Sequence, residues 1–129
     1  MKNKTATTKK TPDLQRYKLS VEEDSFWEME VEVDLNHPEL PKALEEMVMF
    51  WTRGEERLEF AGGDYLKAFL GQLAEWSYRC VVGRNYGLNG LLDYYADLEG
   101  YCPMDGSYGI KILQVEGSCQ TGQCEKIAA

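Results

Sequence analysis

The sequence lacks a long apolar run. Nothing in its 129 residues approaches the roughly 20 consecutive apolar residues that a membrane-spanning helix needs. The basic start at residues 1–10 leads into no apolar stretch, so we expect no secretory signal, no membrane association and a cytoplasmic location. Disorder is not expected for the body of the chain, because 43% of the residues are hydrophobic and 12% are aromatic. The length suits one domain with one core.

Residues typical of catalytic and metal sites are also scarce. The only histidine, His37, stands before Pro38 at a position typical of a helix start, and no nucleophile lies beside it in a catalytic motif. The closest cysteine pair is Cys119 and Cys124, whereas a zinc site is typically built from two close pairs. No glycine-bearing segment matches a phosphate-binding loop. We therefore predict no catalytic residue, no metal ligand and no cofactor.

Positive charge is sparse outside the first residues. Residues 1–18 carry six bases and one acid, whereas residues 19–129 carry eight bases and 21 acids, and the net charge is −8. A body this acidic repels phosphate backbones, so we expect it to bind no nucleic acid directly and to favour a basic protein partner. The alternative is that the charge only keeps a small protein soluble.

Residues 28–34 alternate between acidic and apolar side chains. An acid stands at every second position: Glu28, Glu30, Glu32 and Asp34. Because strand side chains point to opposite faces in turn, this pattern predicts a strand that starts at Phe26 or Trp27 and ends at Leu35. One face of the strand is apolar. The other carries a row of carboxylates that are spaced roughly 7 Å apart and exposed to water.

A second alternating segment precedes this strand. Residues 16–21 alternate in the same way, and the polar residues 22–25 join the two segments, which indicates a hairpin. In that hairpin Arg16 and Lys18 face the carboxylate row as cross-strand partners, and several acids are expected to stay unpaired. A last strand is predicted from Ile110 to Glu116.

Three further segments follow helical spacing. They cover residues 40–51, 66–80 and 88–98, with Asp64 placed to cap the second helix. Residues 55–60 fit either a short helix or an extended link.

The order of these elements predicts an α+β fold. We expect a small, mostly antiparallel sheet, built from the N-terminal hairpin and the C-terminal strand, with about three helices packed on one face. Residues 13–117 would form this single domain. Residues 1–12 would be a flexible basic arm, and residues 118–129 a flexible tail.

Two stretches carry a family resemblance. The first is Phe50-Trp51 leading through Glu56-Arg57-Leu58 to Ala61-Gly62-Gly63-Asp64, and the second is Leu98-Glu99-Gly100-Tyr101-Cys102-Pro103-Met104-Asp105-Gly106-Ser107-Tyr108-Gly109-Ile110. Together they resemble a family of small uncharacterised proteins from bacterial and phage genomes, over about residues 26–116. The resemblance implies a single α+β domain and a mobile-element setting. It brings no catalytic residue, because no activity is assigned to that family.

The leading functional hypothesis is a non-enzymatic, acidic protein-binding module encoded by a phage or mobile element. It would inhibit a basic host protein, one that handles nucleic acid or serves in defence, by surface mimicry. The predicted partner-binding residues are Glu28, Glu30, Glu32, Asp34 and Tyr94. The four carboxylates would stand in for backbone phosphates, and Tyr94, which lies off the apolar face of its helix, would be an exposed aromatic contact.

Two alternatives stay open. One is a small enzyme, or a structural or metal-binding regulator, with a cysteine-based site drawn from Cys102, Cys119 and Cys124 with His37. The other is an assembly role through self-association.

Overall fold

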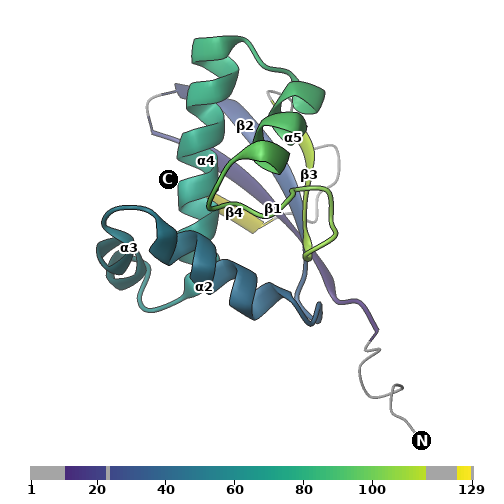
Figure 1. Ribbon diagram of the computed structural model, residues 1–129. Coiled ribbons are helices and arrows are strands. Elements are labelled where there is room, and N and C mark those ends of the chain that lie inside the picture. Colours follow the sequence, from purple (N-terminus) through teal and green to yellow (C-terminus); the bar gives the residue numbers. More distant parts are fainter. Residues whose placement is uncertain (1–10, 23, 116–124, 129) are drawn as a thin grey trace, which may run out of the picture.

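The computed structural model describes residues 11–22, 24–115 and 125–128, and it confirms the predicted α+β class (Figure 1). Along the chain, the elements are β1 (Leu14–Val21), β2 (Asp24–Asp34), α2 (Leu40–Phe50), α3 (Gly54–Phe60), α4 (Tyr65–Arg84), α5 (Leu88–Asp97), β3 (Ile110–Val115) and β4 (Glu125–Ala128). The helices form a layer on one side of the sheet, with the long helix α4 running across it.

The strands form one sheet in the order β3-β2-β1-β4. The predicted hairpin is confirmed, since β1 pairs antiparallel with β2, and β3 pairs antiparallel with β2 on its other side. The fourth strand was not predicted: β4 lies within the segment assigned to a flexible tail, yet it pairs in parallel with β1. Four residues are too few to show a periodic pattern, and this pairing joins distant parts of the chain. The rest of that segment, and residues 1–10 of the predicted arm, lie outside the described residues.

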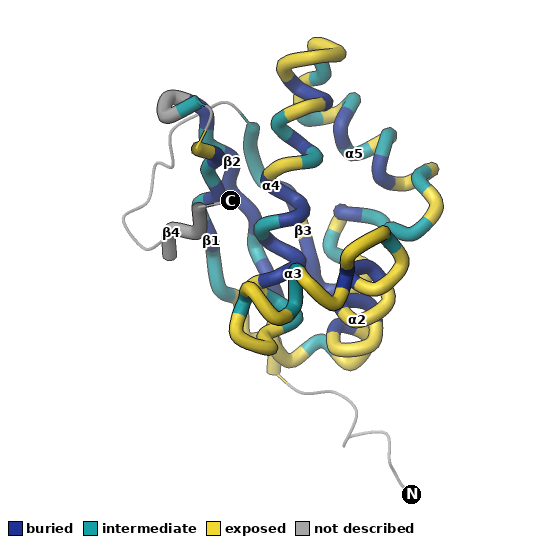
Figure 2. The backbone as a smooth tube through the Cα atoms, turned by 90° about the vertical axis from the view of Figure 1, so that its left-hand side faces the viewer, coloured by how far each residue is buried: buried dark blue, intermediate teal, exposed yellow. Residues whose placement is uncertain are grey.

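The apolar face of the sheet is buried beneath the helices. It carries Tyr17, Leu19, Val21, Met29, Val31, Val33, Ile110 and Ile112. Figure 2 shows buried segments of the strands and helices facing each other across this core. Period-two alternation in β1 and β2 therefore identified the core-facing residues.

The predicted number of helices needs one correction. Residues 55–60, which fitted either a short helix or an extended link, belong to the helix α3, which starts at Gly54, so the described residues contain four helices where about three were predicted. Gly54 is buried, and a Cβ atom there would collide with the Val48 carbonyl at the end of α2. The predicted cap of α4 is present, because the Asp64 carboxylate accepts hydrogen bonds from the backbone N–H groups of Leu66 and Lys67 at 3.0 and 3.2 Å.

Candidate protein-binding site

The carboxylate row lies on the sheet face that points away from the helices, and two bases of β1 pair with it. The Arg16 guanidinium lies 3.5 Å from a carboxylate oxygen of Glu30 and 3.5 Å from one of Glu32. The Lys18 ammonium lies 3.7 Å from Glu28. The predicted cross-strand pairing is thus confirmed.

The fourth acid of the row, Asp34, is bonded to the backbone. Its Oδ1 atom accepts hydrogen bonds from the N–H groups of Asp13 at 2.9 Å and Asn36 at 3.0 Å. The expectation that several acids stay unpaired was therefore wrong. Arg16 pairs with both Glu30 and Glu32. Asp34 accepts backbone hydrogen bonds at the end of the hairpin.

The row is only partly accessible to solvent. The side chain of Glu30 is 8% exposed, that of Glu32 is 20% exposed and that of Glu28 is 26% exposed. Glu30 sits on β2, which has a strand on either side, so the neighbouring side chains shield it. The expected fully exposed row is thus corrected to one that is partly shielded and already paired.

Tyr94 does not join the carboxylates. It lies on α5 in the helix layer, behind the opposite face of the sheet, and it is half-buried. Its hydroxyl accepts a hydrogen bond from Trp76 Nε1 at 3.1 Å, and its ring lies 5.5 Å from the Tyr95 ring. The structure therefore brings the four acids together and leaves Tyr94 in an aromatic cluster, where the sequence had indicated an exposed side chain.

That cluster continues into the buried Tyr95 and the half-buried Tyr101. The rings of Tyr95 and Tyr101 are stacked with their centroids 4.7 Å apart. Tyr95 shares a hydrogen bond of 2.8 Å with Ser77, and the Tyr101 hydroxyl accepts one of 2.9 Å from Gln72. Burial raises the pKa of both phenols well above the ordinary value, so they stay neutral. Their chemistry is that of a packed core.

The described cysteines are protonated thiols at neutral pH. Burial raises the pKa of Cys80, and it raises the pKa of Cys102 to about 11. A nucleophilic cysteine needs the opposite shift. Within residues 11–22, 24–115 and 125–128, no group of three or more His, Cys, Asp or Glu side chains is placed to hold a metal ion. Cys119 and Cys124 lie outside the described residues.

His37 lies just before α2, whose N-cap is Glu39 and whose first residue is Leu40. Its Nδ1 atom accepts a hydrogen bond from the Glu39 N–H at 3.0 Å, so the residue lies near the predicted helix start but does not cap the helix itself. No helix in the described part of the chain is both long and apolar enough to cross a bilayer.

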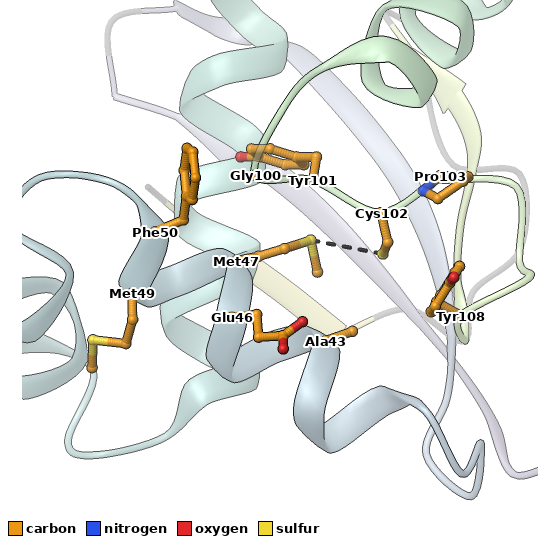
Figure 3. Close-up of a pocket in the computed structure, with 10 residues that line it drawn as sticks. All are labelled: Ala43, Glu46, Met47, Met49, Phe50, Gly100, Tyr101, Cys102, Pro103 and Tyr108. Carbon is orange, nitrogen blue, oxygen red and sulfur yellow. Dashed lines mark hydrogen bonds between the residues drawn. The ribbon is translucent and has the colours of Figure 1, made fainter.

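Sequence reasoning missed a groove between α2 and residues 98–109 (Figure 3). Its volume is about 640 Å³, and it is lined by Ala43, Glu46, Met47, Met49, Phe50, Gly100, Tyr101, Cys102, Pro103 and Tyr108. Its mouth is apolar and open, since Phe50 is 51% exposed, Tyr108 is 39% exposed and Met49 is 37% exposed. The two stretches that carried the family resemblance meet here, which was the one available signal.

The wall formed by α2 is fixed at its end. The Arg57 guanidinium donates hydrogen bonds to the carbonyls of Thr52 at 2.8 Å, Val48 at 3.0 Å and Trp51 at 3.4 Å. A cation placed at the last carbonyls of a helix satisfies groups that have no partner inside the helix. Phe50 is thereby held at the rim of the groove.

The opposite wall is fixed by glycine geometry and by backbone pairing. Gly100 has a φ of +90°, and a Cβ atom there would collide with the ring of Phe50. The Met104 carbonyl accepts a hydrogen bond from the Ile112 N–H at 3.1 Å, and the Met104 side chain is buried. The Asp34 N–H donates to the Gly109 carbonyl at 2.8 Å. These contacts hold the loop against both the sheet and α2.

The amino-acid sequence of this chain matches the model of a protein family. The family is described as a protein of unknown function (DUF2528), and its model matches residues 28–122. Because the match covers more than half of the sequence, the chain belongs to this family.

Relatives of the chain come from a phage and from a prophage. Protein ea10 of Escherichia phage lambda is 28% identical over 101 residues, which span 74% of this chain and 82% of the relative. The lambda prophage-derived protein ea10 of Escherichia coli O6:H1 (strain CFT073) has the same identity and coverage. No solved structure matches the chain. The resemblance to an uncharacterised bacterial and phage family is thus confirmed, and the chain is a phage-related protein of unknown function.

Proposed function

We propose that this protein is a non-enzymatic binding protein, encoded by a phage or mobile element, that inhibits a basic host protein. The host protein would handle nucleic acid or serve in defence, and the acidic surface would occupy its basic site in place of nucleic acid. One observation carries the proposal: the helical pair α2 and α3 exposes an acidic surface that its own bases do not neutralise.

This surface, here called the acidic helical face, spans residues 39–64. It comprises seven exposed acids: Glu39, Glu45, Glu46, Glu55, Glu56, Glu59 and Asp64. The same range contains three bases. Two of them form exposed pairs, Lys42 with Glu46 at 4.0 Å and Arg53 with Glu56 at 3.4 Å, and such pairs contribute little.

The third base adds little positive charge to the surface. Arg57 is half-buried and directs its guanidinium to the carbonyls at the end of α2. The acidic helical face therefore keeps a net negative charge that can attract a basic partner over a distance of about one Debye length.

The carboxylate row on β2 is less suited to the main contact. Its acids already have partners in the fold, so a basic partner would have to replace existing ion pairs rather than form new ones. The proposal accordingly places the principal contact on the acidic helical face. The carboxylate row on β2 contributes to the overall negative electrostatic potential of the protein.

The test is affinity capture with two variants of equal charge. The first, the helical-face variant, combines Glu45→Gln, Glu55→Gln, Glu56→Gln and Glu59→Gln. The matched control combines four exposed acids from elsewhere: Glu22→Gln, Glu75→Gln, Asp93→Asn and Asp97→Asn. Both remove four negative charges, so only the position of the charge differs.

Each protein is used to capture partners from an Escherichia coli lysate at low and at high salt, with quantitative mass spectrometry. We expect the wild type and the control to retain a basic protein that the helical-face variant loses, and we expect salt to weaken its capture. Equal recovery by all three proteins would refute the proposal. The purified partner should also lose nucleic-acid binding when the wild type is added; if it keeps that binding, the mimicry is wrong.

A further inference from the structure

We propose that the groove between α2 and residues 98–109 receives an apolar side chain of the basic partner. Lysine or arginine residues on either side of this anchor would pair with Glu46 on one wall and with Glu99 and Asp105 on the other. The inference rests on the proposed function, because it names the place where that partner docks and the chemistry that the place recognises.

Exposed apolar side chains cluster at this groove. Seven large hydrophobic side chains are exposed in the described part of the chain, and three of them line this one groove: Met49, Phe50 and Tyr108. A single exposed apolar residue needs no explanation, but a cluster around a concavity is typical of a binding site. The volume of about 640 Å³ leaves room for a large side chain in this open groove.

The groove is already formed in the unbound protein. Figure 3 shows the ring of Phe50 beside Gly100 and Tyr101, and the Met47 and Cys102 side chains between the two walls. The sulfur atoms of Met47 and Cys102 are 3.7 Å apart. A preformed site avoids the entropic cost of ordering its walls on binding, and exposed Met49 can adapt to different anchors.

Acidic residues surround the groove. Glu46 lines it directly, and the α2 wall carries Glu45 and Glu46 against one base, Lys42. The loop wall carries the exposed acids Glu99 and Asp105. The Asp105 carboxylate accepts two hydrogen bonds from Ser107, and one base, Lys111 of β3, is paired with Asp105 through a backbone bridge. A groove that is apolar inside and acidic outside complements an apolar anchor flanked by cations, and it repels acidic peptides and nucleic acid.

The probe is a fluorescent peptide with a central tryptophan and two lysines on each side. One matched peptide has serine in place of the tryptophan, and another has glutamate in place of the lysines. We expect only the first to bind in fluorescence polarisation. Its backbone amide shifts in NMR spectra should be confined to residues 40–50 and 98–109. Equal binding of the serine peptide, or shifts outside these segments, would overturn the inference.

Groove variants give the second test. Met49→Lys with Tyr108→Lys, and separately Phe50→Ala, change exposed side chains, so the fold should persist, as circular dichroism can verify. Each should weaken binding of the tryptophan peptide about tenfold or more, the loss typical of a central anchor contact. Phe60→Ala is the matched control, because Phe60 is 96% exposed and lies outside the groove, and it should leave binding unchanged. An equal loss in the control would refute the assignment.

Capture of the host partner separates this inference from the proposed function. Loss of capture by both the helical-face variant and the Met49→Lys/Tyr108→Lys variant supports both ideas. If only the helical-face variant loses the partner, the proposed function stands and the groove inference is wrong. If neither variant changes capture, the proposed function itself is refuted.

Discussion

Arg57 should be one of the most important charged side chains for stability, and Arg57→Met tests this. The substitution keeps most of the apolar stem and removes the guanidinium that bonds to the carbonyls of Thr52, Val48 and Trp51. These groups lie at or just beyond the end of α2, where carbonyls lack partners within the helix. In the variant the Thr52 and Val48 carbonyls must be hydrated or left unsatisfied, whereas the Trp51 carbonyl still accepts a hydrogen bond from the Gly54 N–H at 3.2 Å.

The size of the loss follows from these contacts. The bond to Trp51, at 3.4 Å, is long enough to contribute little, so two bonds from a charged donor remain, at 2.8 and 3.0 Å. Hydrogen bonds to charged groups contribute about 1.5–3 kcal/mol each, and partial rehydration of the carbonyls reduces the sum. We expect a loss of about 3 kcal/mol, or roughly 10–15 °C in Tm for a domain of this size.

Arg53→Met is the matched control. Arg53 lies four residues earlier, is largely exposed and pairs with Glu56 at 3.4 Å, so its loss should cost less than about 0.5 kcal/mol. Arg53 has a φ of +68°. Arginine and methionine bear the same backbone strain in that conformation, so strain does not contribute to the difference in stability between the wild type and Arg53→Met. Urea unfolding followed by circular dichroism gives both values. Equal losses in the two variants, or less than about 1 kcal/mol for Arg57→Met, would contradict this account.

Three further predictions concern the groove, the carboxylate row and the half-buried thiol of Cys102. Gly100→Ala should cost about 2–4 kcal/mol in urea unfolding, from backbone strain and the collision with Phe50, and the cost should shrink in a Phe50→Ala background; an unchanged cost would exclude the collision. Arg16→Met should cost about 1–2 kcal/mol, because shielded Glu30 loses a cation, and a double-mutant cycle with Glu30→Gln should show coupling; additive losses would refute it. Burial raises the pKa of Cys102 from 9.0 to about 11, so its contribution to stability is complete below pH 9 and is lost as the pH rises to 11. Wild type should therefore lose more stability than Cys102→Ala between pH 9 and 11, and parallel pH profiles would contradict the shift.

Local patterns in the sequence determined the elements and their faces. Alternation at residues 28–34 predicted both the strand and its core-facing side, because strand geometry has a period of two whatever lies around it. The same alternation in β1 placed Arg16 and Lys18 beside the acids. Asp64 correctly predicted the start of α4, because an N-cap side chain bonds only to backbone groups close to it in the sequence.

Tertiary contacts decided which surfaces remain open for a partner. Glu30 and Glu28 look alike in the sequence, yet their exposure differs because strands from other parts of the chain flank β2. Phe50 and Gly100 are fifty residues apart, so only the packing of α2 against the loop creates the groove. The side-chain period is a property of the local backbone, whereas exposure depends on every segment that packs nearby, and no short stretch of sequence contains that information.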